Sequence, residues 1–183
     1  MADQNAMLRQ WEAHTTAEFI TRDVDATMRT MTDNPTVLHL PTGMGGVGLD
    51  AVRSFYSTWF VGRNPADLEI QSISQTAGEA TIVDEMVVSF THDSEVPWIL
   101  PGVPATGKRV IIPVIGIVGF EGTAVSYEHI YWDQAAVLAQ VGLLDPAVVS
   151  RLPIITTQHS LLDGSQPTNQ LIQARHLSEG RAE

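Results

Sequence analysis

The sequence predicts one α+β domain in which amino-terminal helices pack on a strongly curved, mainly antiparallel sheet. Three observations support this fold class. Apolar residues recur with helical spacing in the first 60 residues, long apolar strands follow from residue 68, and short turns join most of these strands. Short turns cannot carry parallel crossovers, so the strands form an antiparallel meander. A bent sheet beside helices leaves a concave pocket, which is the usual place for a small ligand.

The amino-terminal part combines helices with one short strand. Helices are expected over residues 7–20, 24–31 and 49–60, and a strand over residues 36–40. Asp23 or Asp25 can cap the free N–H groups of the second helix, which the Asn-Pro pair at residues 34–35 ends. Residues 41–48 are expected to form a glycine-rich turn before the third helix.

The second part of the chain is dominated by strands. Four are expected, over residues 68–76, 80–92, 109–120 and 124–133. The loop over residues 93–108 is rich in Pro and Gly and contains Trp98, which we expect to help form a lid over the pocket. A short helix or irregular cap follows at residues 134–144. We assign residues 1–150 to a single domain and residues 151–183 to an extension that is partly disordered or packed on a partner protomer.

Composition excludes several classes of protein. The 183 residues carry a net charge of -11, so the chain lacks the basic surface of a nucleic-acid binder and does not favour anionic membranes. It has no apolar run long enough to span a bilayer and no signal-peptide pattern. It has no cysteine, which excludes disulfides, thiolate metal ligands and a cysteine nucleophile. We therefore expect a cytoplasmic protein.

Gly43, Gly45 and Gly48 match the G-x-G-x-x-G pattern of dinucleotide sites, and they lie between a strand and a helix. The segment before residue 36 is helical, however, and no second parallel unit follows Glu69. A flexible loop whose glycines permit positive φ angles explains the pattern better than a nucleotide site. We expect no cofactor.

The densest group of polar residues lies in the last predicted strand. Because alternate side chains of a strand share a face, Tyr127, His129, Tyr131 and Asp133 point one way, and Glu128, Ile130 and Trp132 point the other. The first set offers a carboxylate, an imidazole and two phenols, which suit acid–base chemistry and hydrogen bonding to an enolate. The second face is expected to pack under the helices or in a dimer contact.

Structural readings of the same residues remain open. Asp133 ends its strand, so it could cap the turn that follows, and His129 could be a hydrogen-bonded core or interface histidine. Four polar groups on one face of an apolar sheet favour a functional reading, because burying them without partners is costly.

A second carboxylate candidate lies in the strand over residues 80–92. Asp84 and Glu85 are adjacent, so one of them must face the apolar side, where it needs a raised pKa or a cationic partner. His129 is a candidate partner for Glu85 across the sheet. Alternatively, one of the two acids lies at an open edge and both are hydrated.

Other side chains can contribute to substrate binding without forming a motif. The candidates are His39, His14, Trp98, Phe55 and Trp59. No histidine pair has the spacing of a metal site, and no G-x-S-x-G elbow is present, so we predict neither a metal site nor a serine triad. A metal site assembled from residues distant in sequence is not excluded by this argument.

Residues 10–144 resemble the SnoaL-like branch of the nuclear transport factor 2 superfamily. The resemblance rests on the element order, on the RDVDA sequence at residues 22–26, on YEHIYWDQ at residues 127–134, and on QVG at residues 140–142. It implies a cone-shaped α+β barrel that encloses a pocket, and a homodimer formed through the sheet. It also implies that Asp133 is the general base of a polyketide-cyclase-like reaction.

The resulting hypothesis is a small-molecule enzyme that removes a proton next to a carbonyl group without a cofactor. Asp133 would be the base, His129 its acid or orienting partner, and Tyr127 or Tyr131 the donor to the enolate, with Glu85 in a secondary role. The substrate would be a small hydrophobic carbonyl compound. A dehydratase, lyase or hydrolase in the same pocket, and a non-catalytic dimeric binding module, remain alternatives.

Overall fold

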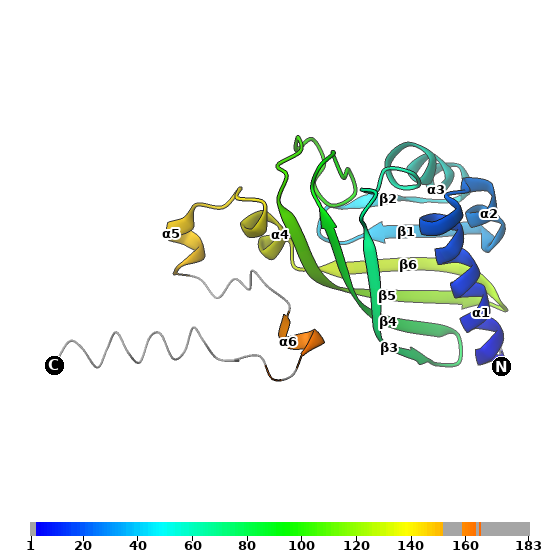
Figure 1. The fold of residues 1–183 in the computed structure, drawn as a ribbon. Helices are drawn as coiled ribbons and strands as arrows, with labels where there is room; N and C mark the ends of the chain where they lie inside the picture. Colours follow the sequence, from blue (N-terminus) through cyan, green and yellow to red (C-terminus); the bar gives the residue numbers. More distant parts are fainter. Residues whose placement is uncertain (1–2, 152–158, 164, 166–183) are drawn as a thin grey trace.

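The computed structural model describes residues 3–151, 159–163 and 165 (Figure 1). The helical elements are α1 (Gln4–Thr15), the π-helical turn η1 (Thr16–Thr21), α2 (Val24–Arg29), α3 (Leu49–Phe55), the π-helical turn η2 (Tyr56–Phe60), α4 (Gln134–Gln140), α5 (Pro146–Val149) and α6 (His159–Leu162). The strands are β1 (Met31–His39), β2 (Met44–Val47), β3 (Glu69–Ala77), β4 (Thr81–Thr91), β5 (Arg109–Glu121) and β6 (Ala124–Trp132).

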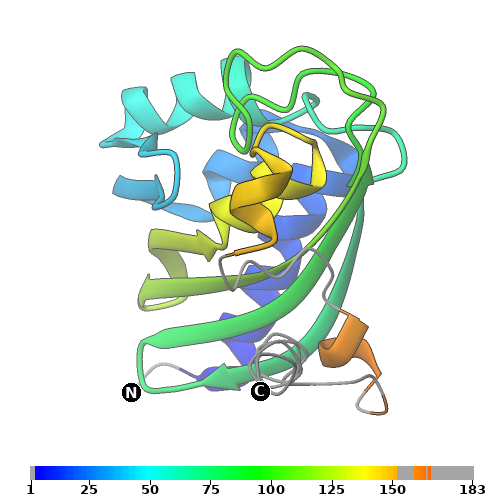
Figure 2. The ribbon, with the colours of Figure 1, turned by 90° about the vertical axis from the view of Figure 1, so that its left-hand side faces the viewer.

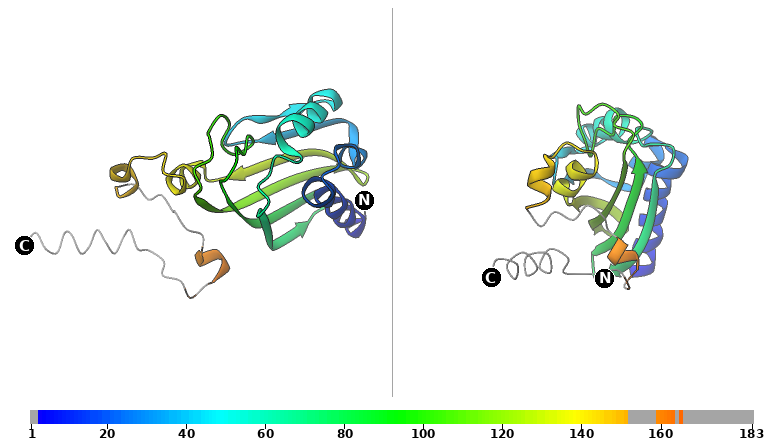
Figure 3. Two further views of the ribbon diagram at one scale, coloured as in Figure 1. Left: turned by 45° about the horizontal axis from the view of Figure 1, so that its top comes forward. Right: turned by 60° about the vertical axis from the view of Figure 1, so that its left-hand side comes forward.

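The six strands form one sheet in the order β2-β1-β6-β5-β4-β3. Only β1 and β6 pair in parallel, and every other neighbouring pair is antiparallel. The sheet is strongly curved but does not close into a full barrel (Figure 2). Helix α1 contacts both β6 and β3, so it lies across the concave face of the sheet (Figure 3). The predicted α+β fold, with helices packed on a curved and mainly antiparallel sheet, is confirmed.

Most element boundaries agree with the prediction, including the cap of α2. The Asp23 carboxylate accepts a hydrogen bond of 2.9 Å from the backbone N–H of Ala26. The second helix ends earlier than expected, at Arg29, and β1 begins at Met31 rather than at residue 36. The early start of β1 follows from its pairing with β6, in which Met31 lies opposite Val125.

The glycine-rich segment contains a strand that the sequence did not predict. In β2, a Cβ atom on Gly45 would lie 1.9 Å from the Val37 carbonyl oxygen, and one on Gly46 would lie 2.6 Å from the Ala51 backbone. These glycines allow β2 to pack between β1 and α3 at backbone distance. The G-x-G-x-x-G match is therefore a packed hairpin.

The loop between β4 and β5 belongs to the hydrophobic core. Val96, Trp98, Ile99 and Leu100 are all buried there, and a role of this segment as a lid stays a prediction. In the part of the chain that the structure describes, no helix has both the length and the apolar character needed to cross a membrane. Most of the predicted extension over residues 151–183 lies outside the described residues.

Candidate functional site

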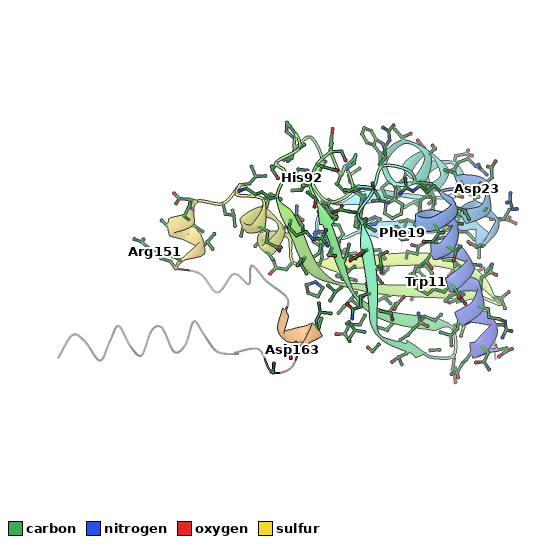
Figure 4. All side chains as sticks on the ribbon, viewed as in Figure 1. Trp11, Phe19, Asp23, His92, Arg151 and Asp163 are labelled. Carbon is green, nitrogen blue, oxygen red and sulfur yellow. The ribbon has the colours of Figure 1, made fainter. Side chains whose placement is uncertain are left out.

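A cavity of about 550 Å³ lies between the α1–η1 segment and the concave face of the sheet. This volume is in the ordinary range of small-molecule sites, roughly 300–1,000 Å³. Trp11 and Phe19 project from the helical segment (Figure 4) and line the cavity. Its other apolar walls include Phe60, Met86, Trp98 and Ile130, and its buried polar side chains are Glu18, His39, Asp84 and Glu128.

Two of these acids belong to a buried polar cluster that we call the His14 network: His14, Glu18, Tyr56 and Glu128. His14 Nε2 lies 3.1 Å from Glu18 Oε1 and 3.0 Å from Glu128 Oε1. The Tyr56 hydroxyl donates a hydrogen bond of 2.8 Å to the same Glu128 oxygen. All four side chains are buried, so the network is shielded from bulk solvent while Glu18 and Glu128 reach the cavity.

The orientation of the His14 ring is also fixed by a contact of its second nitrogen, Nδ1. His14 Nδ1 lies 2.6 Å from Thr30 Oγ1, and the Thr30 hydroxyl donates its own hydrogen to the Thr27 carbonyl oxygen. Thr30 Oγ1 must therefore accept from His14, which assigns a proton to Nδ1. Nε2 is left to face the two carboxylates.

Two π-helical turns supply members of this network. Glu18 lies in η1 and Tyr56 begins η2, whereas Glu128 comes from the inner face of β6. π-Helical turns are rare and are frequent at functional sites. Arg22 follows η1 in the left-handed region, at φ 54°, so the π-helical turn ends there.

The network holds a positive and a negative charge side by side. Burial alone would lower the pKa of His14, but the carboxylates of Glu128 and Glu18 outweigh it and raise the pKa to about 10. Burial would raise the pKa of Glu128, yet contacts with His14 and Tyr56 hold it below its usual value. Burial raises the pKa of Glu18 beyond what His14 can offset, and the Glu128 charge adds to that rise. His14 is therefore charged at neutral pH, and of the two carboxyl groups Glu18 holds its proton more readily than Glu128.

Asp84 is a separate acidic group in the wall of the cavity. Its Oδ2 accepts a hydrogen bond of 2.8 Å from Trp11 Nε1. Its Oδ1 is buried and has no hydrogen-bond partner among the described residues. As expected, Asp84 and Glu85 lie on opposite faces of β4, and the inward-facing acid is Asp84.

His39 lines the cavity as a neutral ring. Burial lowers its pKa to about 4, against the opposing effects of Glu128 and of a hydrogen bond with the Met44 backbone. Its Nδ1 is buried without a partner among the described residues. The His39 ring packs 5.3 Å from the Trp98 ring, which fixes it in an aromatic wall.

The same network contains the group in the described chain that could hold a metal ion. His14, Glu18 and Glu128 each offer one ligand atom, and these atoms lie within 4.8 Å of one another. The Tyr56 hydroxyl lies 3.3 Å from His14 Nε2 and 2.8 Å from Glu128 Oε1, so it contacts two of the three atoms that an ion would need. We therefore describe the group as a hydrogen-bonded network.

The face of β6 that was expected to carry the catalytic groups points away from the cavity, whereas the face that was expected to pack under the helices does lie there. Glu128 and Ile130 line the cavity, whereas Tyr127, His129 and Tyr131 lie on the outer face of the sheet. The Tyr127 ring covers Gly119 of β5, where an added Cβ would lie 1.9 Å from a ring carbon. The tyrosine thus fills a place left by glycine on the neighbouring strand.

Asp133 lies past the end of β6 and outside the cavity lining. Its side chain accepts a hydrogen bond of 3.1 Å from the Ala136 N–H and so caps α4. Capping of the turn after the strand was the alternative to a catalytic role that the sequence left open for Asp133. The structure does not bring Asp133 together with the polar groups of the cavity, because the strand ends before it and the chain turns into a helix.

The remaining predicted residues divide between the cavity and other sites. His39 and Trp98 line the cavity, and His14 lies behind Glu18 and Glu128. Phe55 is buried beside His39, with ring centroids 5.2 Å apart, but it is not part of the cavity lining. Trp59 is 46% exposed. Glu85 accepts a hydrogen bond of 2.8 Å from Ser74 rather than pairing with His129.

Sequence reasoning assigned no role in the site to Glu18, Tyr56 or Glu128. One signal was present for Glu128, which shares a strand face with Ile130 and Trp132. A carboxylate on an otherwise apolar face must be buried and therefore needs partners. For Glu18 and Tyr56 no comparable signal exists, because a π-helical turn changes which helix positions face the core.

Comparisons with known proteins bear on the fold and the family. A family model described as a SnoaL-like domain matches residues 9–127. No curated protein sequence matches the chain. A candidate SnoaL-like polyketide cyclase from Jannaschia sp. superposes with a TM-score of 0.64 at 16% identity, covering 78% of this chain and 95% of that one.

Two further solved structures are similar. A candidate polyketide cyclase from Acidithiobacillus ferrooxidans has a TM-score of 0.62 and 17% identity, over 79% of this chain and 100% of that one. SalBIII, an epoxide hydrolase/cyclase-like enzyme of pyran ring formation in salinomycin, has a TM-score of 0.53 and 18% identity, over 72% and 94% of the two chains. At such identities the likeness establishes the fold alone.

Proposed function

This chain belongs to the SnoaL-like domain family, and we propose that it is a small-molecule enzyme that performs acid–base chemistry without a cofactor. The reaction class is removal of a proton next to a carbonyl group, as in a cyclase or isomerase. The substrate is a small hydrophobic carbonyl compound that fits the cavity of about 550 Å³.

The observation that carries this proposal is the pairing of two unlike carboxyl groups on one histidine. Glu128 and Glu18 both contact His14 Nε2 and both line the cavity. Their environments push their pKa values in opposite directions, which suits Glu128 to the role of the base and Glu18 to the role of the acid. Such divergence within one cavity is the usual physical basis of acid–base assignments.

In the proposed reaction, the Glu128 carboxylate accepts the proton from the carbon next to the carbonyl. The Glu18 carboxyl group donates its hydrogen to the oxygen on which negative charge develops, which stabilises the enolate. His14 Nε2 lies 3.0–3.1 Å from both groups and can return the proton from Glu128 to Glu18. Tyr56 holds the Glu128 oxygen through its 2.8 Å hydrogen bond.

The structural neighbours support the general class rather than one reaction. Two are described as candidate polyketide cyclases and one as an epoxide hydrolase/cyclase-like enzyme. Epoxide hydrolysis is the second candidate, because the same Glu128 and Glu18 could activate a water molecule and protonate a leaving oxygen.

Deuterium exchange tests the proposal without knowledge of the natural substrate. A panel of cyclic and aromatic ketones that raise the melting temperature is incubated with the protein in D2O. Deuterium next to the carbonyl is then followed by mass spectrometry. We expect exchange above the protein-free rate, a loss of at least about 100-fold in Glu128→Gln, and normal exchange in Asp133→Asn.

The control variant also tests the family-based assignment. If Asp133→Asn abolished exchange and Glu128→Gln retained it, Asp133 would be the base and the present proposal would be wrong. The absence of catalysed exchange with every ketone that binds would contradict proton removal as the reaction class.

We also infer that two copies of the chain associate through the outer face of the sheet. This face presents Val83, Ile115 and Tyr131, which are 39%, 41% and 41% exposed. Exposed apolar residues on adjacent strands β4, β5 and β6 are typical of an interaction surface.

A further inference from the structure

Asp84 is a buried acid that the proposed reaction does not use. It is 7% exposed, and the one hydrogen bond of its side chain in the described chain is the contact with Trp11 Nε1. No ion pair among the described residues includes Asp84. Arg9 is a basic side chain at the cavity, but it is 68% exposed and lies 3.8 Å from Asp3. Asp84 therefore has no cationic partner within the described protein.

A buried carboxylate in this state is energetically unfavourable. Removing an ionised group from water is costly unless a hydrogen bond or an opposite charge compensates for it. Trp11 satisfies one oxygen, and Oδ1 has no hydrogen-bond partner in the part of the chain that the structure describes. Because Asp84 lines the cavity, a ligand there can supply the missing donor.

The aromatic lining of the cavity favours a ligand cation over a neutral donor at Asp84. Four aromatic side chains, Trp11, Phe19, Phe60 and Trp98, line the same cavity. The negative face of an aromatic ring attracts an organic cation, by about 0.5–2 kcal/mol depending on how far the cation is desolvated. A cavity that combines a carboxylate with aromatic walls is thus suited to an ammonium group with an apolar body.

The neighbouring strand leaves room beside Asp84. Its partner in β5 is Gly116, which has no side chain on the inner face. An added Cβ at Gly116 would be in ordinary contact with Ile130 Cδ1 at 3.5 Å and with Met86 Cε at 3.9 Å. The glycine keeps this part of the sheet surface open next to the carboxylate.

We propose that the cavity binds a hydrophobic molecule that carries a protonated amine, with an N–H group donating to Asp84 and the ammonium lying against the aromatic walls. This inference rests on the proposed function only in taking the same cavity as the substrate site. The carbonyl group would lie at Glu18 and Glu128, and the amine at Asp84.

A matched pair of probes tests the charge requirement. 2-Phenylethylamine and 2-phenylethanol have the same carbon skeleton and differ in carrying a protonated amine or a neutral hydroxyl group. Dissociation constants are measured at pH 7 by NMR titration of the wild-type protein. We expect the amine to bind at least tenfold more tightly than the alcohol.

Two neighbouring substitutions test the residue. Asp84→Asn keeps the shape of the side chain and should remove the preference for the amine while leaving the affinity for the alcohol unchanged. Glu85→Gln, on the outer face of the same strand, removes the same charge and should change neither affinity. Circular dichroism and melting temperature establish that both variants are folded.

The outcomes are distinct from those of the exchange experiment. The inference would be overturned if the wild-type protein bound the two probes equally or bound neither. It would also be overturned if Asp84→Asn preferred the amine as strongly as the wild-type protein does. Retained exchange on uncharged ketones in Asp84→Asn would leave the acid–base proposal standing. Amine preference that survives in Glu128→Gln would support the present inference even if no exchange were found.

Discussion

The indole Nε1 of Trp11 donates a hydrogen bond of 2.8 Å to Oδ2 of Asp84, and so joins α1 to β4 across 73 residues of sequence. This bond crosses the concave side of the sheet, where the cavity lies. It fixes both the height of α1 above the sheet and the direction of a cavity-lining carboxylate.

Replacing Trp11 with Phe tests the contribution of this bond to stability. Phe retains an aromatic side chain but leaves Asp84 without its hydrogen bond, which costs about 1–3 kcal/mol for a buried acceptor. Urea denaturation followed by the remaining tryptophan fluorescence measures the change. The matched variant Trp59→Phe, at a half-exposed indole, should stay within about 0.5 kcal/mol of wild type. Equal effects of the two substitutions would argue against a specific contribution.

The stability of the protein should fall as the pH rises from neutral towards 10. His14 has a folded-state pKa of about 10, above its ordinary value of about 6.5 in an unfolded chain. The stabilisation that His14 provides is complete below its unfolded-state pKa and is lost as the pH rises through its folded-state pKa. Between about pH 7.5 and 9.5 the native state holds a proton that the unfolded state lacks, so the free energy of unfolding should fall by about 1.4 kcal/mol per pH unit.

The pKa of Glu18 is also raised in the folded state, so Glu18 too can only hold more protons in the native state than in the unfolded state. It can therefore only make the fall of the unfolding free energy with pH steeper. In His14→Gln the histidine contribution to the slope should disappear. His129→Gln, on the outer face of the sheet, should retain the wild-type slope. A wild-type protein whose stability is constant from pH 7.5 to 9.5 would show that His14 is not protonated in the folded state.

The cap at Asp133 leads to a prediction that separates structure from catalysis. Asp133→Ala removes the acceptor of the Ala136 N–H and should cost about 1 kcal/mol, whereas Asp133→Asn retains a capping oxygen and should cost little. Chemical denaturation gives both values. Ligand affinity should be unchanged in both variants, because Asp133 does not line the cavity. A loss of affinity in the Asn variant would place the residue at the ligand site after all.

The outer face of the sheet gives a prediction about assembly. Ile115→Glu introduces a charge at the centre of this face and should convert a dimer into a monomer in sedimentation-velocity experiments. Ile20→Glu, at a residue of η1 that is 76% exposed and does not belong to the sheet, is the control and should leave the dimer intact. A monomeric wild-type protein at micromolar concentration would refute the inferred association.

Local patterns in the sequence predicted the fold well. Apolar alternation marked β3 to β6, and helical spacing marked α1 and α3, because these elements bury one face and leave the other in solvent. The start of β1 and the whole of β2 were not predicted. Both depend on pairing with distant strands, which outweighs the weak local preference of a glycine-rich or proline-containing segment.

The candidate site was harder to predict, because alternation along a strand does not show which of its two faces points inwards. Alternation correctly separated Glu128 from Tyr127 and His129, but it cannot decide which set faces the cavity. That choice depends on the register of β6 against β5 and on the position of α1, which are tertiary features. For β4 the prediction was correct in part, since one of two adjacent acids had to face inwards.

The His14 network also has a consequence for how the domain opens. Its members come from α1, η1, η2 and β6, and they satisfy one another rather than bulk water. Detaching α1 alone would leave Glu128 and Tyr56 in the interior without His14, so partial opening at the amino terminus is penalised. The backbone amides of α1 near His14 should therefore exchange with solvent only through global unfolding, whereas an ordinary terminal helix exchanges by local fraying.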